Sequence, residues 1–399
     1  MNLAPVMGCL TREATRPAYE HFLTELNDPA AVQERLLRWI TRDASLSAYG
    51  THHGLCAQDD TTAFAEKIPI VTYEDLRPWI ERAVFAHEPR VFSSHPIVRV
   101  EPTSGSSSGM KWIPYTRPMM GTFSRMFTLW AHDLLRETFR PRTGRLFLCV
   151  TGGAVDTGSI SPRHVGDDRD YLGPVWRHVL DRFVVAPRFA GTEDPIPLLA
   201  GVLTSEPDLE LMSFWSPSLL LSVVDHLGLE RPEETRRHWP RLQLISCWTA
   251  ASSALFMDRL TGLFPHVRFQ GKGLLATEAA LTIPLERADG YVPLLNDVYL
   301  EFLDENGTVR KLHEIKDGTE HEILISNRSG LLRYRLGDRV RVTGFHRATP
   351  LLNFIGRSGI VSDLVGEKLT LEFVERQLVP AIGSYFCLLP AEGGYQIWL

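Results

Sequence analysis

A loop rich in hydroxyl groups and glycine runs from Thr103 to Lys111, with the sequence Thr-Ser-Gly-Ser-Ser-Ser-Gly-Met-Lys. A short strand pattern precedes it at residues 97–102, and a helical pattern follows at about residues 119–138. Backbone N–H groups and hydroxyls in a loop that opens a helix can surround phosphate oxygens, with Lys111 as the counter-charge. A flexible linker has the same composition, so the loop alone leaves both interpretations open.

Two common nucleotide-binding patterns do not fit this loop. A P-loop requires Gly-x-x-x-x-Gly-Lys-Ser/Thr, whereas here Met110 separates Gly109 from Lys111 and Trp112 follows. No Gly-x-Gly-x-x-Gly pattern with a downstream acidic residue stands out, which disfavours a dinucleotide-binding fold. A nucleotide would therefore be bound in another way.

A second group of candidates lies at residues 332–357, where Leu-Arg-Tyr-Arg-Leu-Gly-Asp continues into a β-type pattern. An arginine before a Gly-Asp turn can place the Asp338 carboxylate to accept hydrogen bonds from two ribose hydroxyls, with a guanidinium near phosphate. The alternative is a surface turn in which the aspartate caps its own backbone. Thr277 and Glu278 follow a strand pattern at residues 267–270, and on their own they are typical only of a turn or cap.

The hydrophobic pattern predicts the elements that must position these residues. Strand patterns alternate with helical ones, which favours an α/β layer architecture, and short strands joined by turns after residue 291 predict a β-rich portion. A helix at residues 72–76 is expected to be capped by Thr72, with Asp75 in its first turn. The remaining helices are predicted at residues 32–40, 218–227 and 254–263. The remaining strands are predicted at residues 144–150, 242–247, 298–303, 322–326, 331–334 and 339–342.

Length and composition exclude several classes of protein. With 399 residues the chain is too long for one compact core, and a formal net charge of −6 disfavours binding to nucleic acid. Five scattered cysteines show no disulfide or zinc spacing and favour the cytoplasm. The chain shows no basic and apolar leader and no run of 18 apolar residues, so neither secretion nor a membrane is expected.

Three segments together resemble a known family. Residues 103–114 resemble the phosphate loop, residues 276–278 the Ser/Thr-Glu motif and residues 334–357 the Tyr-Arg-x-Gly-Asp motif of the Gretchen Hagen auxin-responsive acyl acid amido synthetases and their bacterial relatives. The order and spacing of the motifs agree as well. The likeness extends to residues 68–76 and 298–303 and covers nearly the whole chain.

The resemblance implies the fold of the adenylate-forming superfamily. Its members have a large N-terminal domain of β-sheets flanked by helices, with a β-barrel portion, and a small mobile α/β C-terminal domain. The boundaries expected here are residues 1–355 for the adenylation domain, 356–366 for the hinge and 367–399 for the beginning of the C-terminal domain. Because residues 395–399 have a strand pattern with no closing element, we expect a C-terminal segment to be missing.

The resemblance also implies roles for individual residues. Thr277 and Glu278 would lie at the phosphates and magnesium, with Glu278 as the metal ligand, and Asp338 would bind the ribose. Leu274 stands where the family often has an aromatic residue that stacks on adenine, and Ser106 replaces the usual threonine. The residues expected to bind ATP are Ser104, Gly105, Ser106, Ser107, Lys111, Leu274, Thr277 and Asp338.

The catalytic residues expected are Lys368, Glu278 and Arg357. Lys368 resembles a hinge lysine that contacts the nucleotide or the acyl carboxylate in family members. For the acyl acid, Arg125 on the predicted helix can meet a carboxylate, although a solvated arginine is equally typical there. Trp248 lies at a position that faces ligands in the superfamily, and a core aromatic residue is its alternative.

These assignments predict an ATP-dependent and Mg²⁺-dependent ligase. It would convert a carboxylic acid into acyl-AMP and transfer the acyl group to an amine, expected to be an amino acid. Approach of a carboxylate to the α-phosphate requires cations and fixed dipoles, which Lys111, Lys368 and Arg357 can supply. An acyl-CoA or carrier-thioester ligase and a non-catalytic acyl-binding or nucleotide-binding module remain as alternatives.

Overall fold

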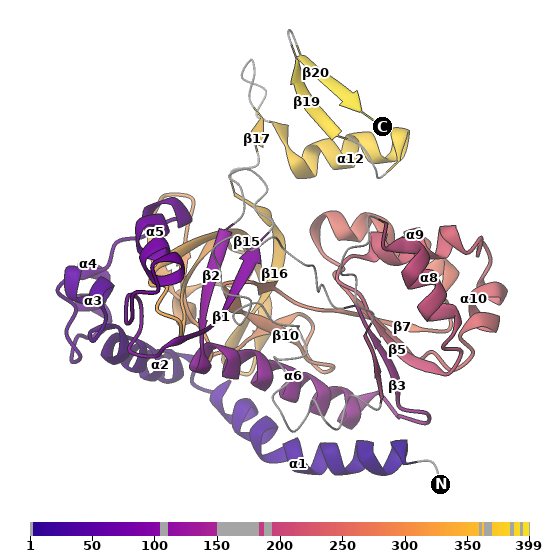
Figure 1. The fold of residues 1–399 in the computed structure, drawn as a ribbon, viewed down its shortest axis with the longest axis horizontal. Helices are drawn as coiled ribbons and strands as arrows, with labels where there is room; N and C mark the ends of the chain where they lie inside the picture. The colour runs from indigo at the N-terminus through magenta and orange to yellow at the C-terminus, as the bar shows by residue number, and fades with distance from the viewer. Residues whose placement is uncertain are drawn as a thin grey trace.

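The structure is a computed structural model. It describes residues 3–103, 111–149, 183–186, 194–358, 361–362, 369–383, 387–391 and 394–398. Two lobes lie side by side along the long helices α1 (Ala4–Glu25) and α6 (Arg117–Glu137), and a small C-terminal part lies across from these helices (Figure 1). In these residues no helix has the length and apolar character needed to cross a membrane.

Capping side chains set the starts of the helices in the first lobe. The Asp28 carboxylate accepts a hydrogen bond from Ala31 N at 3.0 Å. The Asp75 carboxylate accepts from Thr72 N at 2.8 Å and from the Thr72 hydroxyl at 2.7 Å, which confirms the predicted cap. The helices are α2 (Pro29–Ala44), α3 (Ala48–His52), α4 (Thr61–Lys67) and α5 (Tyr73–Ile80), followed by a π-helical turn at Glu81–Phe85.

The predicted phosphate loop joins two strands, not a strand and a helix. Strands β1 (Ile97–Thr103) and β2 (Lys111–Thr116) pair antiparallel, and the helix α6 begins only after β2, where Met119 N donates to Thr116 Oγ1 at 3.4 Å. The expectation of a loop that opens directly onto a helix is therefore wrong. The physical reason is that β2 is buried on both faces from Ile113 to Thr116, and Ile113 and Tyr115 belong to the hydrophobic core, which favours an extended segment.

The first lobe contains a five-stranded antiparallel sheet in the order β13, β12, β14, β15, β16. Its strands are β12 (Tyr299–Leu303), β13 (Val309–Lys311), β14 (Glu320–Ser326), β15 (Tyr334–His346) and β16 (Thr349–Arg357). The β-rich portion is confirmed, but the described strands form an open sheet where a barrel portion was expected. Of the strand predicted at 331–334 only Tyr334 lies in β15, and that prediction is wrong because Arg333, at a φ of +45°, interrupts the extended backbone. The strand predicted at 339–342 is confirmed as part of β15, which bulges at Gly337, at a φ of +83°, and continues.

Two hairpins and a parallel sheet complete the larger part of the molecule. The hairpins pair β8 (Leu275–Ala276) with β9 (Ala279–Ala280) and β10 (Thr282–Pro284) with β11 (Tyr291–Pro293). The parallel sheet has the order β4, β3, β5, β6, β7. Its strands are β3 (Arg145–Leu148), β4 (Val184–Val185), β5 (Leu209–Ser213), β6 (Leu244–Cys247) and β7 (Arg268–Gly271).

The two faces of the parallel sheet are covered by different helices. Met212 and Ile245 belong to a core shared with the helices of the second lobe, whereas Leu211 and Leu244 pack with Leu134 of α6. The helices of the second lobe are α8 (Ile196–Thr204), α9 (Pro217–His226), α10 (Pro232–His238) and α11 (Met257–Leu263), with a 3₁₀ turn at Ala251–Phe256. The mixed α/β class and the strands and helices predicted for this lobe are thus confirmed.

Among its described residues, the C-terminal part contains one helix and two pairs of short strands. These are β17 (Val361–Ser362), β18 (Leu369–Thr370), α12 (Leu371–Ile382), β19 (Cys387–Ala391) and β20 (Gly394–Trp398). The strand predicted near residue 395 is confirmed and pairs antiparallel with β19. The expected hinge at residues 356–366 is described only in part, so the domain boundaries stay a prediction.

Candidate active site

Three segments that are distant in sequence meet at Glu278. The Tyr334 hydroxyl donates to Glu278 Oε1 at 3.2 Å, and Asn327 Nδ2 donates to the Glu278 carbonyl at 2.7 Å. The Tyr115 hydroxyl donates to the carbonyl of Thr277. The strand that follows the predicted phosphate loop, the Thr-Glu pair and the start of β15 therefore share one network.

Asp338 lies beside this network in an ion pair with Arg357. The two residues are partners on β15 and β16, and Arg357 Nε donates to Asp338 Oδ1 at 2.8 Å. Asp338 is only 6% exposed, so it is not the surface turn weighed as an alternative. Burial raises the pKa of Asp338 to about 6, against the lowering effect of Arg357. A buried carboxylate with this single described partner keeps acceptor positions for the hydroxyls of a ligand.

Two of the three cations predicted for the site, Lys111 and Arg357, act on Glu278. Burial raises the pKa of Glu278, while the hydrogen bond from Tyr334 and the charges of Lys111 and Arg357 act to lower it. Lys111 Nζ lies 5.5 Å from the centroid of the Tyr73 ring. The structure thus brings together two carboxylates and two cations, which we call the nucleotide cluster: Lys111, Glu278, Asp338 and Arg357.

Other predicted residues lie outside this cluster or outside the described residues. Leu274 is 8% exposed and part of the hydrophobic core, where its backbone N–H donates to Thr282 Oγ1 at 2.8 Å. The phosphate-loop residues Ser104, Gly105, Ser106 and Ser107, and the hinge lysine Lys368, lie outside the described residues.

Arg125 is held in an ion pair that the sequence does not reveal. Its Nε donates to both carboxylate oxygens of Asp297, at 3.0 and 3.1 Å, and its Nη2 donates to the carbonyl of Asn296 at 3.0 Å. Asp297 is 3% exposed, and burial raises its pKa to about 6. The guanidinium therefore fastens α6 to the segment after β11.

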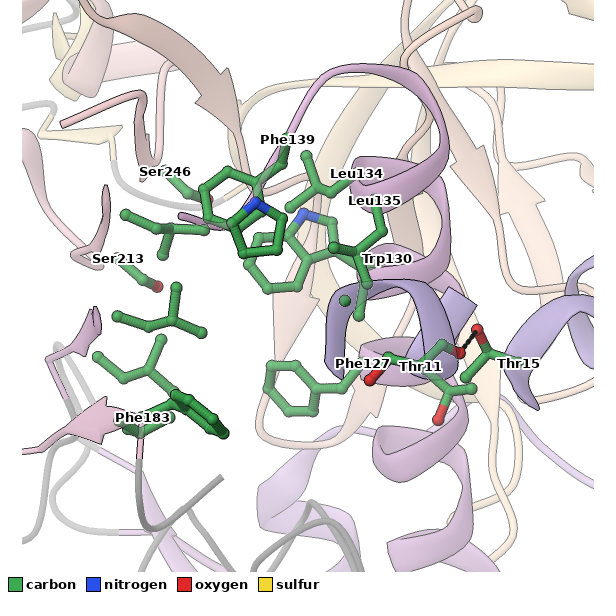
Figure 2. A pocket seen from close by; sticks show the side chains of 18 of the residues that line it. Thr11, Thr15, Phe127, Trp130, Leu134, Leu135, Phe139, Phe183, Ser213 and Ser246 are labelled. Carbon is green, nitrogen blue, oxygen red and sulfur yellow. Dashed lines mark hydrogen bonds between the residues drawn. The ribbon is translucent and has the colours of Figure 1, made fainter. Parts of the chain in front are cut away.

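A mostly apolar pocket of about 220 Å³ lies between helices α1 and α6 and one face of the parallel sheet. Figure 2 shows Trp130, Leu134, Leu135 and Phe139 on one side and Ser213 and Ser246 on the other. The pocket follows the sheet from Gly144, at the start of β3, to Lys272, just after β7. We call this space the α6 pocket.

Lys272 is a functional candidate that the sequence analysis did not select. Its Nζ donates to Ser213 Oγ at 2.6 Å and lies 4.9 Å from the centroid of the Trp215 ring. Glycine is needed beside it, because a Cβ at Gly271 would lie 1.8 Å from Tyr291 Oη and Gly273 has a φ of +77°. The sequence signal that could have identified Lys272 is its position between two glycines, directly after a predicted strand.

Trp248 lies next to the α6 pocket through a second tryptophan. Its backbone N–H donates to the Trp215 carbonyl at 3.0 Å, and the two ring centroids are 5.6 Å apart. Trp215 lines the pocket, and Trp248 is 37% exposed. The structure therefore places Trp248 beside a residue that lines the α6 pocket.

Two models of one protein family match segments of this chain, and known members of that family are similar to it. The model of the GH3 family N-terminal domain matches residues 18–153, and the model of the GH3 family central domain matches residues 291–357. Indole-3-acetic acid-amido synthetase GH3.8 of Oryza sativa subsp. indica is 24% identical over 438 residues, covering 91% of this chain and 71% of that protein. Jasmonoyl-L-amino acid synthetase JAR4 of Nicotiana attenuata is 24% identical over 431 residues, covering 88% and 73%.

Solved structures show the same fold. AtGH3.15 acyl acid amido synthetase in complex with 2,4-DB has a TM-score of 0.75 at 20% identity and covers 90% of this chain and 73% of that one. A 2-hydroxyisobutyryl-CoA ligase in the postadenylation state has a TM-score of 0.61 at 17% identity, covering 91% and 76%.

The two family models together cover slightly more than half of the chain. The resemblance inferred from the motifs is therefore confirmed, and so is the class of enzyme, an ATP-dependent acyl-adenylating ligase. The chain belongs to the GH3 family.

Proposed function

We propose that this chain activates a carboxylic acid with ATP and Mg²⁺ and transfers the acyl group to the amine of an amino acid. The observation that carries the proposal is the meeting of Lys111, Glu278, Asp338 and Arg357 at one place. Such a cluster offers cations for phosphate and carboxylates for ribose hydroxyls and a metal. Location in the cytoplasm, favoured by the scattered cysteines, is part of the same proposal.

The first half-reaction joins the acid to AMP. A carboxylate oxygen of the acid attacks the α-phosphorus of ATP, and the bond from that phosphorus to the bridging oxygen breaks, so that pyrophosphate leaves with the electron pair. Lys111 and Arg357 stabilise the negative charge that spreads over the phosphate oxygens, and Asp338 holds the ribose. Lys368 and the loop residues Ser104–Ser107 are proposed to act at the same phosphates.

A magnesium ion fits the carboxylates of the nucleotide cluster. Mg²⁺ is commonly held by one or two carboxylates together with substrate phosphates, and Glu278 provides a buried carboxylate that feels the charges of Lys111 and Arg357. Within the described ranges no group of three His, Cys, Asp or Glu side chains could hold an ion by itself. When bound with the phosphates, the ion supplies charge neutralisation, and Glu278 is the residue that we expect to hold it.

The second half-reaction forms the amide. The amine nitrogen attacks the acyl carbonyl carbon, the carbon–oxygen bond to phosphate breaks, and AMP leaves while the nitrogen loses a proton. No side-chain nucleophile is needed for either step. The protein's part is to orient the reactants and exclude water.

The acyl part of the substrate is proposed to occupy the α6 pocket. Its walls are mostly apolar, and it shares Leu275, only two residues before Thr277, with the strand that leads to the nucleotide cluster. Trp248 borders the pocket through Trp215. Arg125 is proposed to fix α6, the helix that forms one wall, because Asp297 occupies its guanidinium.

The test is a pyrophosphate-exchange screen over a panel of carboxylic acids, with ATP, Mg²⁺ and no acceptor. Exchange that depends on one of the acids supports adenylation, and no exchange with any acid would leave only a binding module. Amino acids and coenzyme A are then offered separately as acceptors. An amide product supports the amido synthetase, whereas a thioester favours the CoA ligase suggested by the fold shared with 2-hydroxyisobutyryl-CoA ligase.

A further inference from the structure

We propose that Lys272 binds the carboxylate of the acyl acid and that the acid has one carboxylate on a compact apolar body. The inference rests on the proposed function, because it places the acyl acid in the α6 pocket. Lys272 lies outside the three sequence motifs that resemble the family.

The charge in the lining of the α6 pocket comes from one residue. Of the described residues that line it, Lys272 is the only one with a charged side chain. Ser213 and Ser246 lie near the ends of β5 and β6, while the wall from α6 is mostly apolar (Figure 2). A ligand that fills this space therefore needs an apolar body and one group that meets a cation.

Lys272 differs from Arg125 and Arg268 because the described residues include no anionic partner for it. Arg125 is paired with Asp297, and Arg268, at the start of β7, is paired with Glu286. In the described part of the chain, the only hydrogen bond of the Lys272 ammonium goes to Ser213 Oγ, and no carboxylate lies within ion-pair distance. An enclosed cation without a counter-ion costs free energy, which binding of an anion offsets.

The surroundings of Lys272 also lower its pKa, to about 8, because of burial. The titratable groups that face it are the thiols of Cys149 and Cys247. Burial raises the pKa of Cys247 to about 11, so that thiol is neutral where the lysine titrates. The cation is thus lost at a mildly alkaline pH, and none of the described carboxylates acts to retain it.

Topology places Lys272 at the end of the pocket that adjoins the nucleotide cluster. The carboxyl ends of parallel strands meet at one edge of a sheet, and Lys272 follows β7 there, five residues before Thr277. Gly144 and Pro141 line the opposite end, at the start of β3. A carboxylate at Lys272 is then directed toward ATP, and the apolar body extends along the sheet toward α1.

The volume of the pocket limits the size of that body. A cavity of about 150 Å³ holds benzene, so about 220 Å³ holds about one ring with a short chain. Phe127, Trp130 and Phe139 give this space aromatic walls. Suitable probes are benzoate, phenylacetate and 3-phenylpropionate, each with its uncharged amide as a control of the same shape.

The first experiment measures binding without catalysis, as the shift in Tm that each probe causes in the absence of ATP. We expect at least one of the three carboxylates to raise the Tm of the wild-type chain and its amide to raise it far less. K272M should abolish the difference between acid and amide, and K272R should restore part of it. K316M, which alters an exposed turn lysine, should behave as the wild type. Equal shifts by acid and amide in the wild type, or no shift by any probe, would overturn the proposal.

The second experiment separates the role of Lys272 from the proposed function. In pyrophosphate exchange, K272M should raise the KM for the acid by about tenfold or more and leave the KM for ATP unchanged. The KM for the acid should rise above a pH of about 8 in the wild type and be independent of pH in K272M. If the wild type and K272M both exchange pyrophosphate with equal KM for the acid and equal pH profiles, the role of Lys272 is contradicted and the proposed function is not. Absence of exchange in the wild type contradicts the proposed function. The Tm experiment then still tests whether Lys272 binds the carboxylate.

An alternative role for Lys272, binding of a second acidic group of the substrate, can be told apart by a probe with two carboxylates. If the lysine meets a second acidic group and not the reacting carboxylate, 4-carboxyphenylacetate should bind the wild type better than phenylacetate, and K272M should reverse this order. That outcome would overturn the proposal.

Discussion

The nucleotide cluster and the α6 pocket use buried charge in opposite ways. In the cluster, Asp338 is paired with Arg357, and Glu278 accepts a hydrogen bond from Tyr334. In the pocket, Lys272 has a serine and an aromatic ring as neighbours. Paired charges hold strands in place and keep spare acceptors for a ligand, whereas an unpaired charge is stabilised only when a ligand brings the opposite charge.

The same contrast divides the cations around α6. Arg125 is tied to a buried aspartate and acts on the position of the helix, while Lys272 faces the space that the helix encloses. The difference predicts that removal of Arg125 changes stability and that removal of Lys272 changes binding. Four substitutions test this difference between stabilising and ligand-binding charges.

Arg125→Met should cause the largest loss of stability. It leaves the buried Asp297 carboxylate without its partner, for which we expect a cost of about 2 to 4 kcal/mol in the free energy of unfolding. Urea unfolding followed by circular dichroism measures this, with Arg117→Met as a control on an exposed arginine of the same helix. A loss no larger than that of the control would mean that the ion pair does not fasten α6.

Asp338→Ala should weaken binding of ATP by about 1 to 3 kcal/mol, because it deletes the acceptor for ribose hydroxyls and leaves partners unpaired. Calorimetric titration of ATP measures the effect, and Asp317→Ala in an exposed turn is the matched control. A variant that binds ATP normally and is merely less stable would show that Asp338 is structural and that the ribose lies elsewhere.

Tyr334→Phe should cost about 1 kcal/mol of stability, because the buried carboxylate of Glu278 loses one hydrogen-bond donor. The pKa of Glu278 should rise further, since the bond from Tyr334 lowers it. Chemical unfolding of the variant at neutral pH measures the change. No change would indicate that solvent takes the place of the hydroxyl and that the Glu278 network is open to water.

Lys272→Met should change stability with the opposite sign, because it removes an enclosed charge. Because the pKa of Lys272 is lowered to about 8 from 10.5, the unfolded chain binds more protons than the folded one between these values. The stability of the wild type should therefore rise relative to the variant as the pH increases from about 8 to 10.5. Parallel stability curves for the two chains would contradict an enclosed, unpaired lysine.

The two regions also differ in how far the sequence predicts them. The motifs around Thr277, Asp338 and Arg357 are short continuous segments whose order and spacing resemble a family, so their residues were selected in advance. The structure brings Glu278, Asp338 and Arg357 together with Lys111. The bulge at Gly337 was not predicted, because a turn and a bulge have the same local composition.

The α6 pocket could not be predicted from local pattern, because its lining comes from α1, α6 and the strands of the parallel sheet. Asp297, the partner of Arg125, is 172 residues away in the sequence, and only the fold shows that the arginine is occupied. Likewise, the extended β2 was not expected, because burial of Ile113 and Tyr115 depends on the tertiary core. The pocket, the ion pair and the extended β2 depend on tertiary contacts, whereas hydrophobic periodicity predicts only single helices and strands.

The central claim is that the nucleotide cluster and the α6 pocket form one active site. A crystal structure of the whole chain with a non-hydrolysable acyl-adenylate, phenylacetyl sulfamoyl adenosine, tests it most directly. We predict the ribose hydroxyls at Asp338, the acyl carbonyl within hydrogen-bond distance of Lys272 and the ring in the α6 pocket. An adenylate bound elsewhere, or one at Asp338 with its acyl group outside the pocket, would contradict the claim.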